Sequence, residues 1–215
     1  MRLLQKVAQA VTAVKFCGLR TEADVDAAIH VGCDLVGLNF VSASPRVVDT
    51  RAASEIVGSF GSKMLFAGVF KDQSESEVRQ VLAAVPLDFL QFSGQESAAF
   101  CDSFDMPYLK SVHVTGSFDF DQERDQYPSA FAYLLDSMSE LGGGSGKTFD
   151  WERFPTAPNA KVMLAGGLTP NNVAMAIQKT RPWGVDIASG IENADHSKNR
   201  ELMVQFMQGV RSVSA

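Results

Sequence analysis

The sequence predicts a single-domain (β/α)8 TIM barrel. Eight short apolar segments alternate with segments of helical periodicity along the 215 residues. Several of the apolar segments are continuous, which indicates strands that are buried on both faces of a parallel sheet. No linker, low-complexity tract or change of composition divides the chain, and α/β barrels commonly occupy this length as one unit. We therefore expect one barrel domain over residues 1–215, with residues 1–12 as a short N-terminal extension.

The composition is typical of a soluble globular protein, with 46% hydrophobic and 20% charged residues. The net charge of -6 argues against a nucleic-acid partner. No apolar run approaches the length of a membrane span, so no membrane association is expected. Polar residues interrupt residues 1–10 before the apolar core of a signal peptide forms, and three cysteines without tight pairing indicate a reducing compartment. We expect the protein to be cytoplasmic.

The first half of the chain alternates strand and helix signals. A helix is expected to begin at Thr21 or Glu22 and to end at Gly32, because glycine commonly follows the last helical turn. Ser74 and Glu77 have the spacing of a capping box, in which each side chain accepts a hydrogen bond from the other residue's backbone N–H. The other elements expected here are strands at residues 13–17, 35–40, 64–70 and 88–92 and a helix over residues 95–104.

The second half continues the alternation, with one acidic connection at residues 115–128. This connection contains Asp119, Asp121, Glu123 and Asp125. Their spacing lacks the glycine and the terminal glutamate of an EF-hand loop, so a solvated loop or a helix start is favoured over a cation site. The remaining elements expected are strands at residues 108–114 and 131–136 and a final helix with Leu202, Phe206, Val210 and Val213 on one face.

A glycine-rich segment follows the sixth strand, at residues 141–148. Its Gly-Ser-Gly-Lys-Thr sequence superficially suggests a P-loop, but the upstream glycine spacing is missing and no apolar helix follows. The favoured interpretation is a loop that closes over a site at the strand ends. Lys147 would then reach an anion.

The last two apolar segments each end in a glycine turn, and together they predict a phosphate anchor. The turns contain Gly166 with Gly167, and Ser189 with Gly190. One such turn alone is explained by a tight connection between strand and helix. A pair after the last two strands favours a phosphate site, because backbone N–H groups there point at an anion. Thr169-Pro170 indicates the start of the following helix.

In a barrel of this class the active site lies at the C-terminal strand ends, so these ends hold the candidates for proton transfer. Cys17 is the last residue of the first strand, and Asp136 ends the otherwise apolar sixth strand. A cysteine in a strand is more often a small core residue, and Cys33 and Cys101 keep that interpretation. A buried carboxylate without a partner costs free energy, so Asp136 is either functional or a hydrogen-bonded cap on the glycine-rich loop.

The expected opening strand has the sequence Val14-Lys-Phe-Cys-Gly-Leu19, and the loop after the second strand contains Ser44-Pro-Arg46. Both motifs resemble those at the same places in the phosphoribosylanthranilate isomerase family of tryptophan biosynthesis. The resemblance covers nearly the whole chain in order. It continues through Ala67–Phe70, Leu134–Asp136, Gly144–Trp151, Leu164–Leu168 and Gly184–Glu192.

This resemblance implies an Amadori rearrangement of N-(5-phosphoribosyl)anthranilate to 1-(2-carboxyphenylamino)-1-deoxyribulose 5-phosphate. The residue matching the family's general acid is Asp136, which protonates the ring oxygen as the C1–O bond breaks. The residue matching the general base is Cys17, which removes the C2 proton from the resulting iminium. The acid needs a raised pKa and the thiol needs thiolate character for these roles.

The resemblance also implies the substrate contacts. Arg46 pairs with the anthranilate carboxylate, for which a planar guanidinium is suited. Gln91 and Asp186 contact other polar groups of this small-molecule phosphoribosyl substrate. The phosphate is held around Gly166, Gly167, Ser189 and Gly190. No metal site and no cofactor is expected, and the protein is expected to be a monomer or a homodimer.

Two departures and two alternatives bear on this hypothesis. Arg20 stands where the family often has threonine, and Ser93 replaces a usual histidine, which puts any contact made by that histidine in doubt. His113 ends the fifth strand and is expected to be structural. The related histidine-pathway aminoaldose–ketose isomerase resembles this family in fold but has aspartate at the position of Cys17. A non-catalytic phosphosugar-binding barrel is the alternative of a different class.

Overall fold

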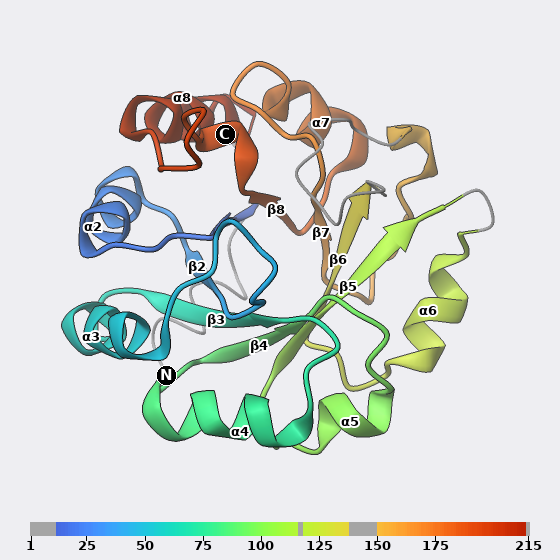
Figure 1. Ribbon diagram of the computed structural model, residues 1–215. Coiled ribbons are helices and arrows are strands. Elements are labelled where there is room, and N and C mark those ends of the chain that lie inside the picture. The colour runs from blue at the N-terminus through green and yellow to red at the C-terminus, as the bar shows by residue number, and fades with distance from the viewer. Residues whose placement is uncertain (1–11, 116–117, 138–149, 214–215) are drawn as a thin grey trace.

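The apolar segments form eight parallel strands that close into a barrel in the computed structural model (Figure 1). The structure describes residues 12–115, 118–137 and 150–213. Strands that are consecutive in sequence are neighbours in the barrel, and β8 pairs with β1 to close it. The predicted barrel is therefore confirmed. The strands are β1 Ala13–Cys17, β2 Leu35–Asn39, β3 Leu65–Phe70, β4 Phe89–Phe92, β5 Tyr108–Val114, β6 Ala132–Ser137, β7 Val162–Leu164 and β8 Gly184–Ile187.

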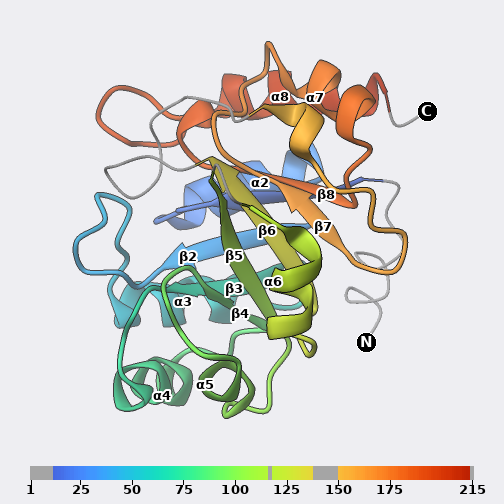
Figure 2. The ribbon, with the colours of Figure 1, turned by 90° about the vertical axis from the view of Figure 1, so that its right-hand side faces the viewer.

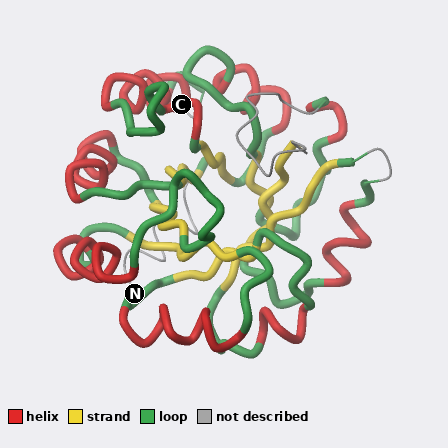
Figure 3. The backbone as a smooth tube through the Cα atoms, in the orientation of Figure 1, coloured by secondary structure: helices red, strands yellow, loops and turns green. Residues whose placement is uncertain are grey.

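Helices surround the strands on all sides, as the red and yellow tubes of Figure 3 show. In the side view of Figure 2, α7 and α8 cover one side of the barrel, and α4 and α5 cover the opposite side. The helices are α2 Glu22–Val31, α3 Thr50–Phe60, α4 Glu75–Ala84, α5 Ala98–Asp102, α6 Phe120–Gln126, α7 Val173–Thr180 and α8 Arg200–Arg211, with short 3-10 turns η1 Trp151–Arg153 and η2 Ser189–Ile191.

The helix ends follow the caps that the sequence predicts, with two exceptions. Thr21 caps α2 in a capping box, Gly32 ends it in a left-handed conformation, and Ser74 with Glu77 forms the capping box of α4. The helix expected over residues 95–104 is shorter, because the Glu96 carboxylate accepts hydrogen bonds from two loop amides before α5 begins. The acidic connection contains α6, whose first turn is capped by an aspartate, as favoured above.

The second exception is the start of α7. The pair Thr169-Pro170 predicted the helix start there, but α7 begins at Val173. The reason is local. The Asn172 side chain accepts a hydrogen bond from the Thr169 N–H and donates one to the Gly167 carbonyl, which holds residues 170–172 in a turn.

Two separate apolar clusters stabilise the barrel. Successive strand side chains point to opposite faces, so one set packs between the strands and the helices, where Phe16, Phe66 and Phe92 are fully buried. Burial of each such side chain contributes about 1.5–3 kcal/mol. The other set fills the lower part of the barrel interior. We call this interior cluster the apolar floor, and it consists of Ala13, Leu35, Leu65, Ala67, Phe89, Leu109, Ala132, Leu134, Met163 and Ala165.

Polar side chains replace apolar ones in the barrel interior above this floor. Lys15 and Cys17 continue the inward face of Ala13 in β1, and Asp186 continues that of Gly184 in β8. Lys15, Gln91 and Asp186 are all buried. The alternation of strand side chains thus separates a stabilising layer from a polar layer at the C-terminal strand ends.

Candidate active site

A buried ion pair lies directly below Cys17. Lys15 of β1 and Asp186 of β8 are register partners on adjacent strands, and the Lys15 Nζ atom lies 2.6 Å from the Asp186 carboxylate. Lys15 is 0% exposed. Because side chains two residues apart on a strand share a face, the ammonium group lies on the same inward face as the Cys17 thiol. Lys15 thus links Cys17 and Asp186, which are two of the predicted site residues.

The Cys17 thiol experiences opposing effects. Burial raises its pKa above the ordinary value, the Lys15 ammonium opposes that rise, and the Asp186 carboxylate adds to it. Burial also raises the pKa of Cys33 and of Cys101, to about 12 each. The Cys33 thiol also lies 3.2 Å from the Leu35 carbonyl, as in a core residue.

Asp136 lies at the C-terminal end of β6 and lines a small cavity together with Asp186. Gly166, Gly167 and Ser189 line the same cavity. The proposed acid and three of the four predicted phosphate residues thus share one space. Asp186 connects this space to Cys17, because its carboxylate contacts the ammonium group below the thiol.

His113 on β5 is the register partner of Asp136 and, like it, points into the barrel at the C-terminal ends of the strands, which we call the mouth. Its Nδ1 atom is buried and has no hydrogen-bond partner among the described residues. Burial lowers the pKa of this imidazole, and Lys71 and Lys110 lower it further. The ring therefore tends to be neutral. A structural role is expected for His113, but among the described residues Nδ1 makes no hydrogen bond that would support this role.

The two predicted glycine turns meet at the strand ends of β7 and β8. Gly166 and Gly167 have positive φ values of 79° and 65°, which residues with a side chain rarely adopt. A side chain at Gly190 would collide with the Leu168 carbonyl, so the two turns pack closely. Within the described part of the chain, the amides of Gly166 and Gly167 donate to no protein acceptor. This arrangement suits an oxyanion.

Arg46 lies at the mouth but already has a partner in the protein. Its Nε and Nη2 atoms donate to the two carboxylate oxygens of Glu192, at 2.7 and 2.8 Å. Lys198 contacts the same carboxylate at 2.6 Å. The predicted contact between Arg46 and a substrate carboxylate is therefore left to the Nη1 atom and to the outward edge of the guanidinium. We call Arg46, Glu192 and Lys198 the mouth triad.

Gln91 is held by the residue that departs from the family pattern. Its Nε2 atom donates to the Ser93 hydroxyl at 3.1 Å and to the Ser111 hydroxyl at 3.3 Å. The Gln91 Oε1 atom is buried and has no hydrogen-bond partner among the described residues. Buried amide oxygens are normally hydrogen-bonded, so this oxygen is suited to accept from a ligand. Ser93 therefore orients a predicted substrate residue.

Arg20, the other departure, connects two loops at the mouth. Its guanidinium donates to the Pro45 carbonyl at 3.1 Å and to the His196 carbonyl at 3.2 Å. The loop after β2 is thereby tied to the loop after β8. The glycine-rich segment and Lys147 lie outside the described residues, as do residues 1–11 of the expected extension.

Sequence reasoning missed Lys15, Glu192 and Lys198 as parts of the site. A signal for Lys15 was present, since a lysine in an apolar strand two residues before Cys17 must share its face. The charge of Glu192 had no local signal, because its partner Arg46 is 146 residues away in sequence.

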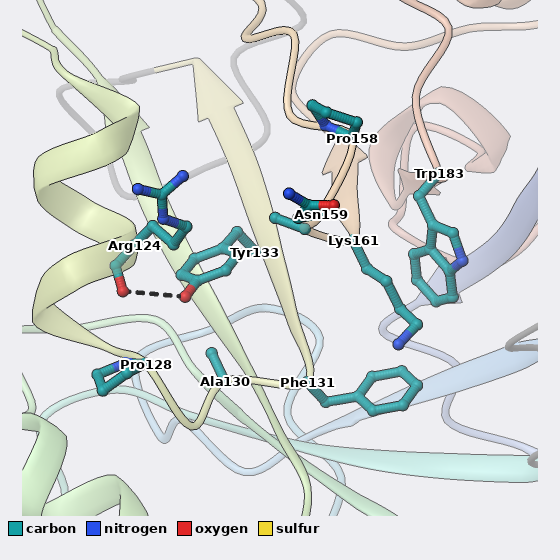
Figure 4. Close-up of a pocket in the computed structure, with 10 residues that line it drawn as sticks. Arg124, Pro128, Ala130, Phe131, Tyr133, Pro158, Asn159, Lys161 and Trp183 are labelled. Atoms are coloured by element: carbon teal, nitrogen blue, oxygen red, sulfur yellow. Dashed lines mark hydrogen bonds between the residues drawn. The ribbon is translucent and has the colours of Figure 1, made fainter.

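A larger hollow of about 450 Å³ lies at the opposite end of the barrel (Figure 4). Phe131, Lys161 and Trp183 line it, and each directly precedes a strand. The Lys161 ammonium lies 4.4 Å from the centroid of the Phe131 ring. Active sites of this fold lie at the C-terminal strand ends, where the buried ion pair and the glycine turns are found. The greater volume of this hollow therefore does not make it the candidate active site.

In residues 12–115, 118–137 and 150–213, no group of three or more His, Cys, Asp or Glu side chains is placed to hold a metal ion. No helix in those same ranges has the length and apolarity to cross a membrane.

Known proteins resemble this chain over nearly its whole length. The family model for N-(5'-phosphoribosyl)anthranilate (PRA) isomerase matches residues 14–209. The N-(5'-phosphoribosyl)anthranilate isomerase of Cellvibrio japonicus is 41% identical over 203 residues, which cover 94% of each chain. The crystal structure of phosphoribosyl anthranilate isomerase from Thermus thermophilus has a TM-score of 0.83 at 29% identity and covers 94% of this chain and 100% of that one.

One further solved structure carries a ligand. It is a phosphoribosyl anthranilate isomerase in complex with reduced 1-(o-carboxyphenylamino)-1-deoxyribulose 5-phosphate. Its TM-score is 0.79 at 26% identity, and the match covers 94% of this chain and 99% of that one. Together with the strand-end residues described above, these matches establish that the chain belongs to the N-(5'-phosphoribosyl)anthranilate isomerase family.

Proposed function

We propose that the protein catalyses the Amadori rearrangement of N-(5-phosphoribosyl)anthranilate to 1-(2-carboxyphenylamino)-1-deoxyribulose 5-phosphate in tryptophan biosynthesis. The observation that carries the proposal is the single cavity shared by Asp136, Asp186 and the glycine turns, next to Cys17. An anchored phosphate would hold one end of the sugar there. The reacting carbons would then lie between a carboxyl group and a thiol.

In the first step Asp136 acts as general acid. It gives its proton to the ribose ring oxygen while the C1–O bond breaks. The electron pair of the anilino nitrogen forms the C1=N bond, and the product is an open-chain iminium. The acid must therefore carry its proton when the substrate binds.

In the second step Cys17 acts as general base. Its thiolate takes the proton from C2, the C2–H electron pair forms the C1=C2 bond, and the iminium nitrogen recovers its pair. The resulting enolamine tautomerises to the ketone. Since burial raises the pKa of Cys17 in the free protein, the thiolate depends on nearby positive charge.

The remaining predicted residues bind and orient the substrate. We assign the phosphate to the backbone around Gly166, Gly167, Ser189 and Gly190. The unpartnered Gln91 Oε1 atom would accept from a substrate hydroxyl or N–H. Asp186 lines the cavity and would contact the sugar. Arg46 would pair with the anthranilate carboxylate, while Glu192 fixes its guanidinium plane.

The experiment is the fluorescence decay of phosphoribosylanthranilate on addition of the pure protein. We expect Cys17→Ser and Asp136→Asn each to lower turnover by roughly 10² to 10⁴, the usual contribution of a general acid or base. Cys101→Ala and Asp121→Asn are matched controls, a buried cysteine of α5 and an exposed aspartate of α6, and should change turnover little. A folded wild-type protein without any acceleration over buffer would refute the proposal.

The setting is proposed from the sequence. The net charge of -6 supports a small-molecule substrate and no nucleic-acid partner. The three free cysteines support a reducing compartment, for which we propose the cytoplasm. Whether the protein is a monomer or a homodimer is decided by light scattering coupled to size-exclusion chromatography.

A further inference from the structure

Lys15 is a buried cation that the proposed steps do not use. It lies above the apolar floor, is 0% exposed, and contacts the Asp186 carboxylate at 2.6 Å. A buried ion pair is often no more stabilising than apolar side chains of similar volume. The layer immediately below is apolar, so packing alone does not explain a lysine here. Its position below Cys17 suggests a role in the chemistry.

The space around this pair is kept open by a glycine on the neighbouring strand. A Cβ atom placed on Gly37 of β2 would lie 2.9 Å from the Cys17 sulfur and 3.0 Å from the Lys15 nitrogen. Real Cβ atoms essentially never show contacts under 3.0 Å, and a contact of 3.0 Å is tighter than nine in ten of those they do show. The sulfur and the ammonium nitrogen therefore converge on one point over Gly37. Any other residue there would push one of them away.

Charged groups surround Cys17 on several elements, and they differ in how far their charge is already neutralised. Lys15 lies below it on β1, with Asp186 beside it on β8. Arg46 and Lys198 approach from the mouth loops, and both are bound to Glu192. Asp136 faces the same cavity as Asp186 from β6, with His113 beside it on β5. Among the cations, Lys15 opposes the rise in the Cys17 pKa most strongly.

The Lys15 side chain carries its positive charge across the neutral pH range. Burial lowers the pKa of the ammonium, but the Asp186 carboxylate and Cys17 outweigh burial, and the pKa lies well above its ordinary value. The Asp186 carboxylate is the larger of these two influences, and it remains beside the ammonium whether Cys17 is a thiol or a thiolate. A fixed positive charge beside a nucleophile or base is the usual means by which proteins favour a cysteine thiolate.

We propose that Lys15 is a positioning residue for the general base: its ammonium group fixes the Cys17 side chain over Gly37 and stabilises the thiolate, while Asp186 holds the ammonium in place. This inference rests on the proposed function, in which Cys17 removes the C2 proton. In that step the thiolate becomes a neutral thiol and Lys15 keeps its proton. Lys15 needs no contact with the substrate.

The test is the pH dependence of Cys17 alkylation by iodoacetamide, followed by mass spectrometry of the peptide that contains Cys17. We expect Lys15→Met to raise the midpoint of alkylation by about one pH unit or more, since one unit is a tenfold change in the thiolate equilibrium. Turnover at neutral pH should fall at least about tenfold, with KM changed less than about twofold, and recover as the pH is raised. Lys15→Arg, which keeps the charge, should restore much of both.

A control guards against loss of the fold. Lys15→Met leaves the Asp186 carboxylate without its partner, so the double variant Lys15→Met/Asp186→Asn removes both charges. Because Lys15 acts on the Cys17 pKa more strongly than Asp186 does, the midpoint should still rise in the double variant. An unchanged midpoint in whichever variant is folded overturns the inference. Failure of the proposed function would be a separate result, because it would appear as normal turnover in Cys17→Ser. The alkylation midpoints of the wild type and of Lys15→Met could still be compared in that case.

Discussion

Replacing Glu192 by glutamine tests the mouth triad most directly. The side chain of Glu192 is 2% exposed, and its carboxylate lies 2.7 Å from the Arg46 guanidinium and 2.6 Å from the Lys198 ammonium. Glutamine keeps the shape but leaves two nearly buried cations facing each other. Removing one partner of a buried ion pair costs about 3–5 kcal/mol. For a domain of this size that corresponds to a fall in Tm of roughly 6–20 °C.

The assay is thermal unfolding by circular dichroism, with urea unfolding as a second measure. Glu55→Gln is the matched control, because the ion pair of Glu55 with Arg51 is largely exposed, and exposed pairs of this kind contribute about 0.3–0.5 kcal/mol. A Tm of Glu192→Gln as close to wild type as that of Glu55→Gln would refute the reasoning. It would mean that the triad is solvated.

The pH dependence gives an independent check on the same variant. Burial raises the pKa of Glu192, but its hydrogen bonds to Arg46 and Lys198 outweigh burial and lower the pKa below 4.5. A group with a lowered pKa in the folded state stabilises the fold above its unfolded pKa and loses that contribution as the pH falls. The stability difference between wild type and Glu192→Gln should therefore be constant near neutral pH and shrink below about pH 4.5. A difference that stays constant in acid would contradict this account.

Three further changes probe two positions near the site and the buried ion pair of Lys110 with Glu96. Gly37→Ala should lower kcat, because the added Cβ would lie 2.9 Å from the Cys17 sulfur and 3.0 Å from the Lys15 nitrogen; unchanged kcat in steady-state kinetics would argue against close packing there. Ser93→Ala should raise KM roughly twofold to tenfold, the worth of one hydrogen bond to Gln91, and an unchanged KM would show that Ser93 is not needed to orient Gln91. Lys110→Met leaves the buried Glu96 carboxylate unpaired and should cost about 3–5 kcal/mol in urea unfolding; a loss below about 1 kcal/mol would show that Glu96 is solvated.

Strand positions were predictable because strands buried on both faces are continuous apolar runs. The bounds expected for residues 13–17 and 108–114 are those of β1 and β5. Helix bounds that depend on tertiary hydrogen bonds were not predictable. The expected helix over residues 95–104 begins only at Ala98, since the Glu96 carboxylate binds the amides of Asp72 and Gly94.

The candidate site divides in the same way. Cys17 and Asp136 became candidates because each comes at the end of an apolar strand, and the glycine turns because they follow the last two strands. Pairings between distant segments leave no local pattern in the sequence. The bond between Arg46 and Glu192 is of this kind, and it changes how Arg46 can meet a substrate. The position of Ser93 as a support for Gln91 required the neighbouring strand to be placed as well.

In the described structure, the apolar floor closes the barrel interior at the end opposite the mouth. Its side chains close the barrel below Lys15, so the polar layer opens toward water only at the mouth, where the substrate would sit. A hydrogen taken up by the Cys17 thiol would thus return to solvent only past the bound sugar phosphate. The share of a C2 isotope label that appears at C1 of the product rather than in solvent would then report how well the bound substrate shields the Cys17 thiol from water.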